Sequence, residues 1–126
     1  MEHTGPRRVL VVEDDEGIRE TLKDLLELEG YDVAVAEHGR AAIEHLLEQG
    51  PDPDVIVLDL MMPVMNGEEF RQRQLEDERW AQIPVLVISA APPERSAAIG
   101  NRFVKKPFNL ETILGAVDDL AGMHLH

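Results

Sequence analysis

The sequence contains no cysteine, which excludes disulfide scaffolds, thiolate metal sites and cysteine nucleophiles. Basic residues are also scarce, because 12 Lys and Arg stand against 25 Asp and Glu and leave a net charge of −13 with neutral histidines. This balance argues against a nucleic-acid binder, whose affinity normally depends on a basic face. It suits a basic partner, or a site that needs a cation.

Long hydrophobic runs are missing as well. No stretch approaches the roughly 18 apolar residues that a membrane span requires. The first residues, MEHTGPRR, have no apolar region behind their charges that would indicate a signal peptide. A length of 126 residues with 44% apolar content is typical of one globular domain. We therefore expect a cytoplasmic domain over residues 7–122, between a flexible tail at 1–6 and a frayed end at 123–126.

The chain does contain a regular alternation of strand-like and helix-like segments. Short runs rich in Val and Ile, without strict alternation of apolar and polar residues, indicate strands buried on both faces. Four such runs are Val9–Val12, Val33–Ala36, Val55–Leu58 and Val85–Ile88, and a fifth, weaker apolar run is Phe103–Val104. Apolar residues at helical spacing fill the intervals at 18–26, 43–47 and 110–117, with a thinner stripe at 67–80. Five strand–helix units predict an α/β fold, with a parallel sheet covered by helices on both faces.

Polar residues follow four of the predicted strands, at the point where each strand ends. They are Glu13, Asp14 and Asp15 after the first strand, Asp59 at the end of the third, Ser89 at the end of the fourth and Lys106 shortly after the fifth. In a parallel sheet these positions lie on one edge, where open α/β sheets bind their ligands. Crowded carboxylates repel, so a proton or a hard cation with oxygen ligands, Mg²⁺ first, is needed to relieve them. Lys106 would then face an anionic group held by that metal.

Each of these residues also has a purely structural interpretation. The acidic run can cap the following helix, because acids stabilise helix N-termini. A hydroxyl such as that of Ser89 commonly bonds the backbone at a strand end, and a lysine such as Lys106 is commonly a surface residue. Asp59 is harder to explain in this way, since an acid that ends a buried apolar run needs a partner or solvent. The coincidence of four strand ends favours a functional site.

Four segments resemble the signatures of one family. VLVVEDDEGIR, VIVLDLMMPVMNG, PVLVISA and FVKKPF look like those of the response-regulator receiver domain of two-component signal transduction. The resemblance extends from about residue 8 to about residue 120, which suggests a stand-alone, single-domain protein. It implies a flavodoxin-like, doubly wound, five-stranded parallel sheet in the order 2-1-3-4-5.

The resemblance also assigns the acidic residues. It makes Asp59 the phosphoacceptor and Glu13 and Asp14 the acidic pair that helps to hold Mg²⁺. The carboxylates of Asp14 and Asp59 would bind the ion directly, together with the main-chain carbonyl of Met61 and water. Glu13, which is longer by one methylene, would act through such a water.

The remaining motif residues are those that respond to the phosphoryl group. By the same resemblance, Lys106 and Ser89 contact the phosphoryl oxygens, and Phe103 is the aromatic switch residue that buries its ring in response. The Lys106–Pro107 peptide is expected to be cis. The stretch between Ser89 and Lys106 is several residues shorter than is usual in the family. We therefore expect a shortened fourth helix, between Pro93 and Ile99, and a remodelled surface around it.

The implied function is that of a phosphoacceptor switch in a phosphorelay, rather than an enzyme with a separate substrate. The expected partners are a sensor histidine kinase or histidine phosphotransfer protein and an unidentified downstream protein, with no nucleic acid or membrane. The chain itself is expected to be a monomer or weak dimer. The alternative is a pseudo-receiver, which would act as an interaction module without being phosphorylated.

Overall fold

The computed structural model describes residues 5–48, 51–90 and 99–123 of the chain. Along the sequence the elements are β1 (Arg8–Val12), α1 (Glu16–Leu28), β2 (Asp32–Ala36), α2 (Gly39–Leu47), β3 (Val55–Asp59), α3 (Gly67–Leu75), β4 (Val85–Ser89), β5 (Arg102–Lys105) and α5 (Leu110–Met123). Most of the expected short fourth helix lies outside the described residues, as do positions 1–4 of the expected tail and 124–126 of the expected frayed end. Met123, which was expected to belong to that frayed end, is the last residue of α5.

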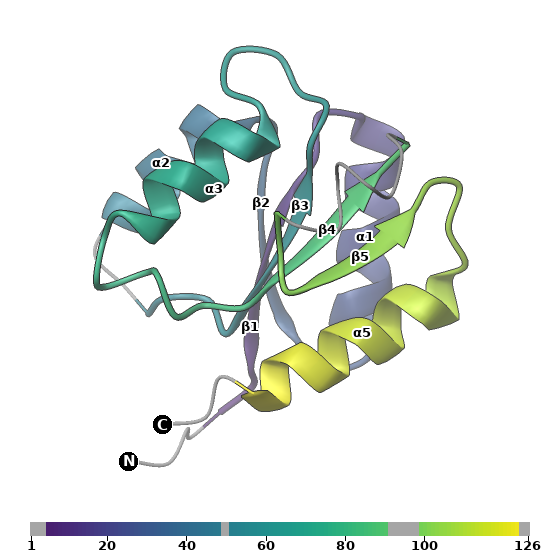
Figure 1. Ribbon diagram of the computed structural model, residues 1–126. Coiled ribbons are helices and arrows are strands. Elements are labelled where there is room, and N and C mark those ends of the chain that lie inside the picture. Colours follow the sequence, from purple (N-terminus) through teal and green to yellow (C-terminus); the bar gives the residue numbers. More distant parts are fainter. Residues whose placement is uncertain (1–4, 49–50, 91–98, 124–126) are drawn as a thin grey trace.

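The five strands form one parallel sheet in the order β2-β1-β3-β4-β5, which confirms the predicted topology. Figure 1 shows α2 and α3 on one face of this sheet and α1 and α5 on the other. β1 and β3 pair in parallel at the point where the order of the strands reverses. Their carboxyl ends therefore lie side by side. None of the described helices is long and apolar enough to cross a membrane.

Two apolar clusters, one on each face, hold the helices to the sheet. The α2–α3 face includes Leu10, Ile56, Phe70 and Val87, and the α1–α5 face includes Val11, Leu22, Val57 and Ile113. Every residue of β3 and β4 is buried, as a Val- and Ile-rich run without alternation predicts. Full burial of one such side chain contributes roughly 1.5–3 kcal/mol, so these strands form a rigid base for the residues at their ends.

Helix α3 explains why the sequence between 67 and 80 has only a thin apolar stripe. Gln74 occupies a fully buried position, and its side-chain amide donates to the carbonyls of Trp80 and Ile83 at 2.8 and 3.0 Å. The helix begins with a reciprocal capping box between Asn66 and Glu69 and ends at Leu75. Trp80, which shared the predicted stripe, therefore lies in the turns after the helix and packs into the core from there.

Candidate functional site

The predicted acidic residues converge at the carboxyl edge of the sheet. Val12 pairs with Leu58, so Glu13 and Asp59 follow as neighbours on adjacent strands. Glu13, Asp14 and Asp59 each place a carboxylate oxygen within 4.8 Å of the other two. Glu13 and Asp59 are buried, with exposed fractions of 0% and 2%, whereas Asp14 is exposed. Two desolvated carboxylates therefore lie beside a third that faces solvent.

Lys106 is the cation of this cluster. Its Nζ lies 2.8 Å from Glu13 Oε1 and 3.6 Å from Asp59 Oδ2. The Lys106 amide donates to the carbonyl of Ser89 at 2.9 Å, which continues the β4–β5 pairing beyond the last residue of β5. The Lys106–Pro107 peptide is cis, as the family resemblance implied. The continued β4–β5 pairing thus places the Lys106 ammonium group beside the carboxylates of Glu13 and Asp59.

The acidic run after β1 divides between two roles. Asp15 is the N-cap of α1, because its side chain accepts a hydrogen bond from the amide of Ile18 at 2.9 Å. Glu13 is not a cap. Its Oε2 accepts from the Asp15 amide at 3.1 Å while its Oε1 faces Lys106. The helix-capping interpretation therefore holds for Asp15 but does not account for Glu13 or Asp14.

The site shifts the protonation of its own residues. Burial, and after it the charge of Glu13, raises the pKa of Asp59 to about 7, against the opposing effects of Lys106 and the Met61 amide. Burial acts to lower the pKa of Lys106, but the hydrogen bond to Glu13 and the charge of Asp59 outweigh it and raise that pKa. The metal-free cluster therefore has an affinity for one more positive charge near neutral pH.

A divalent cation with oxygen ligands fits this arrangement. Mg²⁺ prefers carboxylate, carbonyl and water oxygens, and the cluster offers three carboxylates within reach of one ion. The β3–α3 loop passes close beside them, and the Met61 amide donates to Asp59 Oδ1 at 3.3 Å. A Cβ added at Gly67 would lie 2.5 Å from the Asp59 carbonyl, so only glycine allows the chain to pass this close to the strand end.

Ser89 and Phe103 lie on β4 and β5, the two strands that follow Asp59's strand β3 in the order of the sheet. Ser89 ends β4 and is fully buried, one residue beyond the Asp59–Ile88 pair. Phe103 lies in β5 opposite Val87 and is half-buried against the α2–α3 cluster. Ser89 therefore lies on the strand next to the predicted phosphoacceptor, whereas Phe103 lies one strand farther away.

Sequence reasoning gave no role to Arg19, although it belongs to the first recognised segment. Its Nη1 donates to the carbonyls of Glu13 and Asp14 at 2.9 and 3.3 Å. The available signal was its position four residues after the N-cap. Helical side chains point back toward the N-terminus, and this one reaches the acidic loop.

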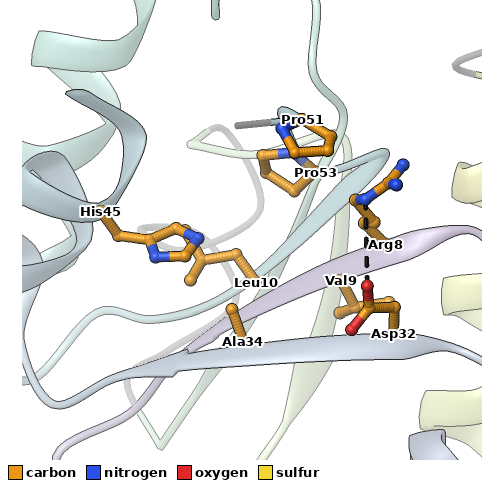
Figure 2. Close-up of a pocket in the computed structure, with 8 residues that line it drawn as sticks. All are labelled: Arg8, Val9, Leu10, Asp32, Ala34, His45, Pro51 and Pro53. Carbon is orange, nitrogen blue, oxygen red and sulfur yellow. Dashed lines mark ion pairs between the residues drawn. The ribbon is translucent and has the colours of Figure 1, made fainter. Parts of the chain in front are cut away.

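A separate cavity of about 210 Å³ lies at the opposite edge of the sheet. Figure 2 shows Arg8 and Asp32, the first residues of β1 and β2, on one side of the cavity and His45 on the other, with two prolines of the loop before β3 between them. Arg8 Nε lies 3.9 Å from Asp32 Oδ2. The cavity contains none of the clustered carboxylates and is not part of the candidate site.

Comparisons with known proteins agree with this geometry. Residues 9–118 match the model of the response regulator receiver domain. The chain is 40% identical over 114 residues to the response regulator MprA of Mycolicibacterium vanbaalenii, covering 86% of this chain and 48% of that protein. It is also 36% identical over 124 residues to the sensor histidine kinase TmoS of Ectopseudomonas mendocina, covering 94% of this chain and 12% of that protein.

Solved structures with the same arrangement include two response regulators. The chemotaxis response regulator CheY4 of Vibrio cholerae superimposes with a TM-score of 0.82 at 32% identity, over 91% of this chain and 98% of that one. The response regulator TrrA of Thermotoga maritima, solved in complex with Mg²⁺–BeF, has a TM-score of 0.78 at 29% identity, over 90% and 98% of the two chains.

The chain therefore belongs to the response regulator receiver domain family, the phosphoacceptor domains of two-component systems. It spans about half or less of the length of the curated relatives named here.

Proposed function

We propose that this chain is a phosphoacceptor switch that receives a phosphoryl group on Asp59 from the phosphohistidine of a sensor histidine kinase or phosphotransfer protein. The observation that carries the proposal is the convergence of Glu13, Asp14, Asp59 and Lys106 at one edge of the sheet. Receiver domains accept phosphoryl groups from histidine kinases, and in this chain three carboxylates and a lysine lie together at the carboxyl edge of the sheet.

In the proposed transfer, a carboxylate oxygen of Asp59 attacks the phosphorus and forms an O–P bond as the N–P bond of the phosphohistidine breaks. The departing imidazole nitrogen keeps the electron pair of the broken bond. Asp14, Asp59 and the Met61 carbonyl would hold a Mg²⁺ ion, with Glu13 acting through water, and the bound ion would supply positive charge to the phosphoryl oxygens. The chain thus catalyses only its own phosphorylation and dephosphorylation.

Lys106 and Ser89 would stabilise the product. The ammonium group of Lys106, already 3.6 Å from Asp59, would pair with a phosphoryl oxygen. Ser89 would donate its hydroxyl hydrogen to a second oxygen. The half-buried ring of Phe103 can then bury further and shift the population between two packings.

The relatives support the proposed metal and partner. One solved receiver, TrrA, is described as a complex with Mg²⁺–BeF, and one curated relative, TmoS, is a sensor histidine kinase that contains a segment similar to this chain. Signalling would then pass through contacts with a second protein, whose identity depends on surfaces outside the site.

Intact-mass measurement after incubation with acetyl phosphate and Mg²⁺ tests the proposal. The native chain should gain one phosphoryl group, and Asp59→Asn should gain none. Asp24→Asn removes the same charge from an exposed position on α1 and should label like the native chain. Equal labelling of Asp59→Asn would refute the assignment, and an unlabelled native chain would identify an unphosphorylated interaction module.

A further inference from the structure

Arg19 reaches backward from α1 to the loop that carries two of the acids. Its Nη1 donates to the main-chain carbonyl of Glu13 at 2.9 Å and to that of Asp14 at 3.3 Å. The side chain is half-buried, so this contact is only partly shared with water. One guanidinium thus joins the two consecutive residues whose carboxylates face Asp59.

Helix stability does not explain this placement. A cation close to the N-terminus of a helix opposes the helix dipole, which favours acids there. The cap itself is already supplied by Asp15. Arg79 and Arg102, by contrast, pair with the carboxylates of Asp52 and Asp119. Arg19 instead directs its donors to carbonyl oxygens that precede the helix.

The contact has a clear physical consequence for the cluster. To the extent that Lys106 does not compensate it, repulsion between Glu13, Asp14 and Asp59 acts to separate the β1–α1 loop from β3 in the absence of a metal. Hydrogen bonds from a charged donor are stronger than neutral ones, so Arg19 can hold the backbone of this loop against that repulsion. The carboxylates then remain in place before a cation arrives, and less ordering is needed when it binds.

We propose that Arg19 is a positioning residue for the divalent-cation site, and that it acts by fixing the Glu13–Asp14 backbone rather than by touching the ion. This inference rests on the proposed function, because it assumes that the acidic cluster binds Mg²⁺. It predicts that loss of Arg19 weakens Mg²⁺ binding without impairing the chemical step once the metal is bound.

The test compares Mg²⁺ binding by calorimetry for the native chain, Arg19→Ala, Arg19→Lys and Arg40→Ala. Arg40 is exposed in the first turn of α2, so its replacement removes the same charge without removing a hydrogen bond to the Glu13–Asp14 backbone. Partners that orient metal ligands typically change affinity by 10–100-fold, and we expect a loss of about tenfold for Arg19→Ala. Arg19→Lys, which keeps one charged donor, should recover part of it, and Arg40→Ala should bind like the native chain.

The dependence of the labelling rate by acetyl phosphate on Mg²⁺ concentration is a second measurement. It would not change if Arg19 only stabilised the fold. For Arg19→Ala the Mg²⁺ concentration at half-maximal rate should rise about tenfold, while the rate at saturating Mg²⁺ stays within about twofold of the native value. If Arg19→Ala does not fold, Arg19→Met keeps the length of the side chain and serves the same comparison. Native affinity in the alanine variant, or an equal loss in Arg40→Ala, would overturn the inference alone. A native chain that binds no Mg²⁺ would overturn the proposed metal site as well.

Discussion

Lys106 lies closer to Glu13 than to Asp59, at 2.8 Å against 3.6 Å. Glu13 has no solvent exposure, so its carboxylate depends on this ammonium group and on the Asp15 amide for compensation. In the metal-free chain the lysine is therefore a counter-ion of the acidic pair. Breaking a buried ion pair by removing one partner is costly, because the other charge remains buried.

We expect Lys106→Met to lower the free energy of unfolding at pH 8 by about 2–3 kcal/mol in the absence of metal. The loss should shrink at acidic pH, where the carboxylates take up a proton. Chemical denaturation at both pH values measures it. Lys105→Met replaces the exposed lysine that precedes Lys106 and should have little effect on the free energy of unfolding. Equal stability of the two variants would mean that Glu13 is compensated by another group.

The raised pKa of Asp59 predicts a dependence of stability on pH. The pKa is about 7 in the folded chain against a usual 3.8. Between these values the folded state keeps a proton that the unfolded state releases, so this residue's contribution to stability falls as pH rises from about 4 to 7. Asp59→Asn removes the dependence and should be more stable than the native chain by about 2 kcal/mol or more at pH 8.

Denaturation without metal at several pH values measures this gap, which should nearly vanish at pH 4. Asp24→Asn is the control, because Asp24 is exposed and its substitution should give a nearly constant difference from the native chain. If the difference in stability between Asp59→Asn and the native chain did not change with pH, the Asp59 carboxyl group would be ionised throughout this range.

Asp14 offers a prediction about the metal itself. It is the exposed member of the three carboxylates, so Asp14→Asn relieves repulsion while removing a proposed metal ligand. We expect the metal-free chain to gain about 0.5–1 kcal/mol in stability. We also expect Mg²⁺ to raise the melting temperature less than in the native chain, because stabilisation by a ligand follows its affinity.

Asp15→Asn is the matched control for that experiment. It removes one charge from the same loop, yet asparagine can still cap α1 as Asp15 does. The response of its melting temperature to Mg²⁺ should therefore stay close to that of the native chain. If Mg²⁺ raised the melting temperatures of Asp14→Asn and Asp15→Asn equally, Mg²⁺ binding would depend only on the overall charge of the loop.

The fold and most of the site could be predicted from the sequence because both depend on strands. Val- and Ile-rich runs predicted four of the strands and a weaker apolar run predicted β5, and parallel pairing then brought Asp59 and Glu13 to one edge. The partner that Lys106 prefers in the absence of metal could not be predicted. That preference depends on differences of less than 1 Å between side chains, which spacing along the chain does not determine.

Polar residues in unusual places were the main source of error. Gln74 reads as a surface residue, and its burial became visible only with the turn that brings two carbonyls to its amide. Arg19 reads as one of the exposed charges of α1, because its partners are main-chain carbonyls and carbonyls leave no mark in the sequence. Both side chains donate to main-chain carbonyls, and the positions of those carbonyls cannot be read from the pattern of side chains along the sequence.

Gln74 should accordingly be one of the most sensitive polar residues for stability. Gln74→Ala leaves the carbonyls of Trp80 and Ile83 without their donor and opens space in the core. We expect a loss of about 2–4 kcal/mol in the free energy of unfolding. Gln72→Ala, at an exposed position of the same helix, should cost little. Comparable losses in the two variants would indicate that helix propensity, rather than the buried amide, sets the effect.

Val64 is a source of strain in the loop between β3 and α3. Its φ is 67°, a left-handed conformation that is unfavourable for a β-branched residue, and the Met65 amide donates to the Pro63 carbonyl across it at 2.7 Å. The side chain is 69% exposed, so it gains little from burial. Val64→Gly should therefore stabilise the chain by about 1 kcal/mol, since relief of 1–3 kcal/mol of strain exceeds the added flexibility of glycine when unfolded. Val64→Ala keeps a Cβ at the same φ and should give a smaller gain, so the difference between the two variants in chemical denaturation isolates the backbone contribution. A destabilised Val64→Gly would mean that the turn is held without strain, and that the valine side chain contributes more than its exposure indicates.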